Sequence, residues 1–267
     1  MAGRVGQVAR KRGALRLHVG AGPTAAVLLL FPLALAACTD PPGPPPASSG
    51  TAQTRAVPPS VSELPLTDQH GRMVTLESFR GKTVMVVPFL TLCSDVCPMT
   101  SGNLLQVQHS LDAAGVAGKV QIVELSVDPD RDTQARLAAY APLTGATWEL
   151  VTESDSDLAT IARFFGFTYE KVPQDDPPAI DWWTGKPLTY DVNHSDGYVL
   201  LGPDGQERFS TGAPPAFSGS LNPKLHAFLS DEGLEHLANP PQPSWTPSDA
   251  LASLGWMVSE SVPYHPN

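Results

Sequence analysis

The run TVMVVPFL, at residues 83–90, limits the possible folds of this chain more than any other segment. Its residues are almost all apolar, so both faces of a strand made from them are expected to be buried. Strands with this pattern are typical of sheets that have parallel neighbours and are covered by helices. The segment therefore predicts an α/β fold.

Signals for strands and helices alternate around this run. The expected strands are 119–127 and 146–152, the expected helices are 98–114, 130–141 and 154–167, and the expected hairpins are 64–82 and 197–210. Asp132 or Thr133 is the expected N-cap of the second helix. This order predicts a layered α/β domain with a central mixed sheet flanked by helices, to which N-terminal and C-terminal hairpins are added.

Two cysteines, Cys93 and Cys97, follow the buried strand within TLCSDVCPMT. They are expected where the strand ends and the next helix begins, a place where ligands bind in open α/β sheets and the helix dipole stabilises a thiolate. Residues four apart in a helix have Cβ atoms about 5–6 Å apart, whereas a disulfide needs about 3.8 Å. A soft metal such as Cu(I) and a redox pair are therefore both favoured over an inert disulfide.

The first 37 residues have the features of an export signal. Five basic residues and no acidic ones precede the run VLLLFPLALAA, which is too short and too interrupted by proline for a membrane span of about 20 residues. Residues 35–38, LAAC, resemble the lipobox of bacterial lipoproteins, in which the cysteine carries lipid. We therefore expect a lipoprotein signal peptide at 1–37 and lipidation of Cys38, with an ordinary signal peptide as the alternative.

The rest of the chain divides by composition. Residues 38–59 are rich in Pro, Ser and Gly and are expected to form a tether from the extracytoplasmic face of the bacterial cell membrane. The folded domain is expected at 60–232. The Pro-rich C-terminal extension at 233–267 contains a short amphipathic stretch, and the sequence leaves open whether it packs on the domain, binds a partner or does neither.

The charge of the chain argues against one class of partner. There are 17 basic and 27 acidic residues, and the five charges before Cys38 are all basic, so loss of that segment changes the net charge from −10 to −15. A protein this acidic lacks the basic patches that nucleic acids require, and anionic lipid repels it. Nucleic acid is therefore not an expected partner, and the lipid anchor is the expected link to the membrane.

Three segments, FLTLCSDVCPMT, ELSVDPDRDT and VNHSDGYVLLGPDG, resemble in this order the Sco/SenC family of copper-binding proteins that assist assembly of cytochrome c oxidase. The resemblance spans about residues 64–210. It implies a thioredoxin-like fold in which Cys93, Cys97 and His194 bind copper. It also matches a family signature after the second core strand, formed by Asp128, Pro129, Arg131 and Asp132.

Two positions depart from the family pattern. Ser94 stands where the family usually has a proline after the first cysteine, and Asn193 replaces the usual aspartate before the histidine. Neither change removes a ligand that the resemblance implies. The choice of partner is therefore less well predicted than copper binding.

Other soft, aromatic or imidazole side chains have weaker claims to a function. Met99 is expected in the core, and His70 and His109 are expected to be solvated. Trp182 and Trp183 either dock a partner or cover the domain's own core. No role is predicted for the histidines of the C-terminal part, which are His226, His236 and His265.

The leading hypothesis is a lipid-anchored metallochaperone that is not an enzyme. Cys93, Cys97 and His194 would hold Cu(I), with Cu(II) as a second state. The copper would pass by thiolate ligand exchange to the copper-bearing subunit of cytochrome c oxidase, with another copper chaperone as a further partner. The alternative is a thiol–disulfide oxidoreductase in which Cys93 and Cys97 are catalytic and keep the oxidase cysteines reduced. A peroxidase-like enzyme is a third, weaker hypothesis.

Overall fold

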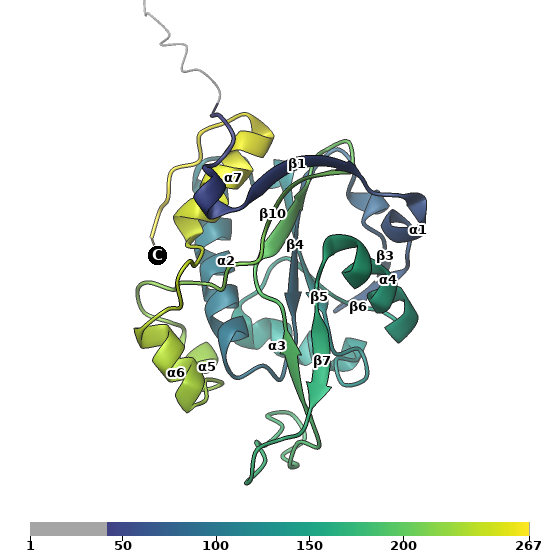
Figure 1. Cartoon of the computed structure of the whole chain (residues 1–267), viewed down its shortest axis with the longest axis vertical. Helices are drawn as coiled ribbons and strands as arrows, with labels where there is room; N and C mark the ends of the chain where they lie inside the picture. Colours follow the sequence, from purple (N-terminus) through teal and green to yellow (C-terminus); the bar gives the residue numbers. More distant parts are fainter. Residues whose placement is uncertain (1–41, 267) are drawn as a thin grey trace, which may run out of the picture. The chain divides into compact units, whose positions relative to one another are not determined.

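The computed structural model describes residues 42–266, so the predicted signal peptide and Cys38 lie outside the described residues (Figure 1). Eight strands form one mixed sheet in the order β1-β10-β9-β4-β5-β6-β2-β3, and β7 and β8 form a second, two-stranded sheet. Within residues 42–266, no helix combines the length and the apolar content that a membrane span needs.

The elements have the following bounds. The strands are β1 Thr51–Ala56, β2 Leu66–Asp68, β3 Met73–Val74, β4 Thr83–Phe89, β5 Val120–Ser126, β6 Glu149–Thr152, β7 Tyr169–Val172, β8 Asp191–His194, β9 Tyr198–Leu201 and β10 Gln206–Thr211. The α-helices are α1 Pro59–Ser62, α2 Val96–Ala113, α3 Gln134–Thr144, α4 Asp155–Phe165, α5 Pro223–His226, α6 Asp231–Ala238 and α7 Pro247–Val258.

The strand β4 lies in the middle of the large sheet, as its apolar sequence predicts. All of its residues are buried. It pairs in parallel with β5 and antiparallel with β9, and β5 pairs in parallel with β6, so the sheet is mixed. The order β10-β9-β4-β5, with a helix directly after β4, is that of a thioredoxin-like fold. The predicted fold class is therefore confirmed.

Helices cover both faces of this sheet. The helix α2 contacts α3 and α7, whereas α4 contacts α1, and Figure 1 shows α2 and α7 on one side of the sheet and α1 and α4 on the other. Pro98 lies in the first turn of α2, where its missing N–H costs no hydrogen bond. The side chain of Thr133 caps α3, whereas the other predicted cap, Asp132, is buried.

The N-terminal boundary of the domain differs from the prediction. Residues 51–56, which composition assigns to the tether, form β1 and pair antiparallel with β10 at the edge of the sheet. Their side chains are mostly exposed, so the segment lacks the apolar alternation by which a strand is recognised. Backbone pairing and an ion pair between Arg55 and Glu207 hold this strand.

The predicted C-terminal extension is part of the folded domain. The helix α7 packs against α2, and its residues Leu251 and Leu254 are buried. Just before α7, the buried Trp245 packs edge to face on Tyr198 of β9. The domain therefore does not end at residue 232, and packing on the domain is the alternative that the structure selects for this segment.

Candidate metal centre

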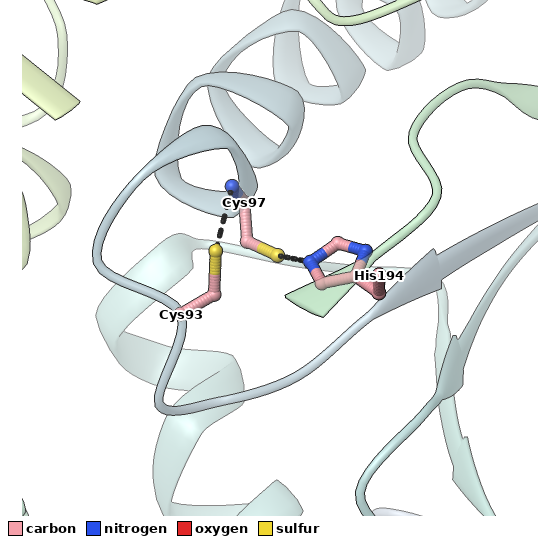
Figure 2. A group of neighbouring side chains, drawn as sticks. All are labelled: Cys93, Cys97 and His194. Carbon is pink, nitrogen blue, oxygen red and sulfur yellow. Dashed lines mark hydrogen bonds between the residues drawn. The ribbon is translucent and has the colours of Figure 1, made fainter. Parts of the chain in front are cut away.

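The thiol pair lies where β4 meets α2, as the sequence predicts (Figure 2). Cys93 is in the connecting loop and partly exposed, whereas Cys97 is in the first turn of α2 and is only 1% exposed. Neither thiol is in a disulfide. The backbone N–H of Cys97 donates to the sulfur of Cys93, with 3.3 Å between the two atoms. The start of the helix thus stabilises negative charge on Cys93.

His194 reaches the thiol pair from the smaller sheet. It is the last residue of β8 and pairs with Tyr169 of β7. Its Nε2 lies 3.4 Å from the Sγ of Cys97, and its Nδ1 lies 2.9 Å from the carbonyl oxygen of Ser195. Because a carbonyl only accepts, Nδ1 carries a proton and Nε2 faces the thiols. The ligand atoms of Cys93, Cys97 and His194 all lie within 4.8 Å of one another, so the structure brings the three predicted ligands together.

The donor set and its surroundings suit a soft metal ion that enters and leaves. Two sulfurs and an imidazole nitrogen are the ligands that Cu(I) prefers, whereas zinc normally takes a fourth ligand. Cys93 and His194 line a cavity of about 430 Å³. Its wall also holds the carboxylates of Asp95, Asp175, Asp191, Asp196 and Glu232.

The two thiols have opposite pKa shifts. The neighbouring side chain of Cys97, together with the charge of His194, holds the pKa of Cys93 well below its usual value despite its partial burial. Burial and the neighbouring Cys93 raise the pKa of Cys97 well above its usual value. Burial opposes a charge on His194, but the Cys93 thiolate outweighs it and raises the pKa of His194 to about 9. These shifts favour a thiolate at Cys93, a thiol at Cys97 and an imidazolium at His194 in the metal-free site.

The ring of His194 faces both sulfurs. Its hydrogen-bond contact is with Cys97, whereas the charge that raises its pKa is on Cys93. Both sulfurs are near the imidazole because the three ligand atoms all lie within 4.8 Å of one another. Binding of a metal ion here would release protons, since the thiol and the imidazolium must give up theirs to become ligands.

A buried carboxylate anchors the loop that carries the thiols. Asp132 accepts hydrogen bonds from the hydroxyl of Thr91, from the backbone N–H of Thr91 at 3.1 Å, and from the hydroxyl of Ser126 at 2.8 Å. The indole N–H of Trp182 donates to the carbonyl of Thr91 at 2.8 Å. Because Thr91 is two residues before Cys93, these bonds position the beginning of the loop.

Asp128 and Arg131 connect this region to the strand that carries His194. Arg131 forms an ion pair with Asp128 and donates to the carbonyl of Tyr190 at 2.7 Å. The hydroxyl of Tyr190 donates to Asp128 at 2.8 Å. Since Tyr190 directly precedes β8, these contacts hold the strand so that His194 faces the thiols. The signature residues Asp128 and Arg131 therefore help to position the candidate ligand His194.

The structure also places the weaker candidates. Met99 is 1% exposed and belongs to the core, while His70 and His109 are exposed, as predicted. Trp182 packs against the core, whereas Trp183 is 45% exposed.

The sequence does not predict that His236 lies near the thiols. The Nδ1 of His236 lies 2.7 Å from the Oδ1 of Asp95, which is between the two cysteines. His236 lies far along the chain, and no local pattern links it to the thiol loop, so only the fold reveals this contact.

Comparison with known proteins identifies the family. The SCO1/SenC family model matches residues 52–214, which is more than half of the chain. The mitochondrial protein SCO2 homolog of Bos taurus is 32% identical over 143 residues, which is 54% of this chain and 50% of that protein. The chain thus spans about half the length of this curated relative.

Solved structures with lower similarity include two Sco proteins. ScoI of Bradyrhizobium japonicum with copper bound is 26% identical and covers 62% of this chain and 94% of that chain, with a TM-score of 0.48. BsSco, a member of the Sco family of cytochrome c oxidase assembly proteins in which a disulfide switch was identified, is 21% identical and covers 63% of this chain and 87% of that chain, with a TM-score of 0.41. Because the family model by itself covers more than half of its length, the chain belongs to the SCO1/SenC family.

Proposed function

We propose that this protein is a copper metallochaperone, which holds copper with Cys93, Cys97 and His194 and delivers it to the copper-bearing subunit of cytochrome c oxidase. The observation that carries the proposal is that two sulfurs and one imidazole nitrogen lie within 4.8 Å of one another beside an open cavity. This donor set is soft and has a low coordination number, as Cu(I) requires, and Cu(II) is a second candidate state. Membership of the SCO1/SenC family supports it.

Ligand exchange is the transfer step that the geometry favours. Cys93 and His194 are partly exposed at the cavity, whereas Cys97 is buried. An incoming thiolate of the partner would therefore replace the exposed ligands first and Cys97 last. The copper keeps its oxidation state, and the released Cys97 and His194 take up the protons that they lost on binding. Another copper chaperone is a further candidate partner, as the donor of the metal.

Replacing His194 with alanine is expected to weaken Cu(I) binding by the reduced protein at least about a hundredfold, because changes even outside the ligand shell cost tenfold to a hundredfold. Titration with Cu(I) against a competing chelator measures the affinity. His109→Ala is the matched control, because this exposed histidine lies near the C-terminal end of α2, far along the helix from Cys97. The control variant should bind Cu(I) like the wild type. Equal affinity in His194→Ala and the wild type would contradict the assignment of His194 as a ligand.

A thiol–disulfide oxidoreductase is the second candidate, and the paired thiolate and thiol favour it. The lowered pKa of Cys93 favours the thiolate that attacks a disulfide, and Cys97 can then resolve the mixed disulfide. This activity needs both cysteines but not a metal ligand at position 194. Turnover of a protein disulfide that survives His194→Ala, together with an absence of Cu(I) binding by the wild type, would select the oxidoreductase over the chaperone.

We further propose that Cys38 carries lipid and anchors the domain on the extracytoplasmic face of the bacterial cell membrane. The basic segment, the short apolar run and LAAC at residues 35–38 support this. Cys38→Ser is expected to move most of the protein out of the membrane fraction, because the acyl chains provide the attachment. Fractionation followed by immunoblotting measures this, with Cys93→Ser as the control that should stay bound. Retention of Cys38→Ser on the membrane would contradict the anchor.

A further inference from the structure

The segment from 215 to 245, called here the α5–α6 segment, leaves the domain after β10 and returns to the same point before α7. Its base is closed by two backbone hydrogen bonds, from Ala216 N–H to the Trp245 carbonyl at 2.8 Å and from Trp245 N–H to the Pro214 carbonyl at 2.9 Å. It lies beyond the residues that the family model matches. Figure 1 shows α5 and α6 beside α2, and both helices contact α2. The segment therefore lies outside the matched residues and packs next to the helix that carries Cys97.

This segment touches Ser94 and Asp95, two of the three residues between Cys93 and Cys97. Ser230 donates twice to the carbonyl of Ser94, from its backbone N–H at 2.8 Å and from its hydroxyl at 3.1 Å. The Nδ1 of His236 pairs with Asp95 at 2.7 Å. Gly233 lies so close that a Cβ added to it would be 2.5 Å from the Ser94 oxygen and 3.1 Å from the Asp95 Cα. Backbone and side-chain contacts thus converge on one short stretch of loop.

The same segment forms part of the wall around the site. Ser230 and Glu232 line the cavity onto which Cys93 and His194 open. Ser230 thus restrains the backbone at Ser94, and His236 restrains the side chain of Asp95.

We propose that the α5–α6 segment is a positioning element for the thiol loop, in which Ser230, Gly233 and His236 hold Ser94 and Asp95 and so slow the release of copper from Cys93. The effect on copper rests on the proposed function, but the restraint on the loop does not. The His236 and Asp95 side chains are 27% and 33% exposed, so their ion pair contributes little to global stability. Its loss is therefore expected to loosen the loop without unfolding the domain.

Hydrogen exchange of the metal-free protein tests the restraint directly. In His236→Ala, the amides of residues 94–97 are expected to exchange about tenfold faster, because local opening of the loop becomes easier. His236→Asn should restore protection, since the asparagine side-chain N–H takes the place of Nδ1–H toward Asp95. His109→Ala is the control and should exchange like the wild type. Unchanged exchange in His236→Ala would overturn the proposal.

Capture of copper by a chelator tests the consequence. Cu(I) is expected to leave His236→Ala about tenfold faster than the wild type, and His236→Asn should be close to the wild type. Failure of the wild type to bind Cu(I) would count against the proposed function, whereas normal exchange protection in His236→Ala would count against the positioning role. A second equivalent of metal that binds the wild type and is lost in His236→Ala would make His236 a ligand with Asp95 and Glu232, and would also overturn the positioning role.

A second variant acts on the same loop by a different route. Gly233→Ala adds one methyl group in a helix, where alanine is intrinsically better than glycine. The new Cβ would nevertheless collide with the Ser94 oxygen. Faster exchange of residues 94–97 in a variant whose melting temperature is unchanged is the expected result. Wild-type exchange in both Gly233→Ala and His236→Ala would show that the segment only covers the loop.

Discussion

Replacing Cys97 with serine is expected to weaken Cu(I) binding about a thousandfold or more, which corresponds to about 4 kcal/mol. The thiol is 1% exposed, and its sulfur lies 3.4 Å from the Nε2 of His194. A serine hydroxyl is a hard, neutral ligand that Cu(I) binds poorly, and a buried site offers little water in its place. The loss should exceed that of His194→Ala, because a thiolate provides both charge and softness.

Competition titration of the reduced protein measures this loss. Met99→Leu is a matched control, since Met99 also carries a buried sulfur two residues along α2, but it belongs to the core. Its replacement by leucine conserves volume and should leave the Cu(I) affinity unchanged. A loss in Met99→Leu as large as that in Cys97→Ser would contradict the ligand assignment.

Replacing Leu254 with alanine is expected to lower the free energy of unfolding by about 2–5 kcal/mol, the range for large-to-small changes in cores. Leu254 is fully buried in α7, the helix that packs on α2. The change removes apolar contacts and leaves a cavity next to the helix that holds Cys97. The region that composition marks as a C-terminal extension should therefore contribute substantially to the stability of the domain.

Urea denaturation of the purified protein measures this destabilisation. Leu234→Ala is the control, because it removes the same side chain from α6, where Leu234 is 38% exposed. A change of less than about 1 kcal/mol is expected there. If the two variants were equally stable, α7 would not be part of the core.

Local sequence patterns predicted the elements that are buried along their whole length or that begin at a clear helix-start signal. The strand β4 is buried throughout, so its apolar run reports its place in the sheet. The cap at Thr133 and the proline at Pro98 act within one turn of helix, and their sequence signals are equally local. The position of Cys93 and Cys97 follows from these elements, because the end of a strand and the start of the next helix are consecutive in the chain.

Elements held by distant partners were harder to predict. The strand β1 is exposed along most of its length and depends on pairing with β10, so its composition is that of a linker. The helix α7 begins at a proline after a proline-rich stretch, and its burial depends on α2, which lies far earlier in the chain. The hydrophobic pattern of an edge strand such as β1, or of a helix such as α7, does not identify the element against which it packs.

The sequence by itself determined an α/β chain with a reactive thiol pair at the N-terminus of a helix. The reason is that the signals for a buried strand and for the start of a helix each lie in neighbouring residues of the chain. Resemblance to a family added His194 as a third candidate ligand, but nothing local in the sequence predicts its contact with Cys97. Only the tertiary structure decided that β8 carries this imidazole to within 3.4 Å of the sulfur and that α6 holds the loop between the thiols. The physical reason is that these contacts join elements distant in sequence, whose side chains do not encode which partner they meet.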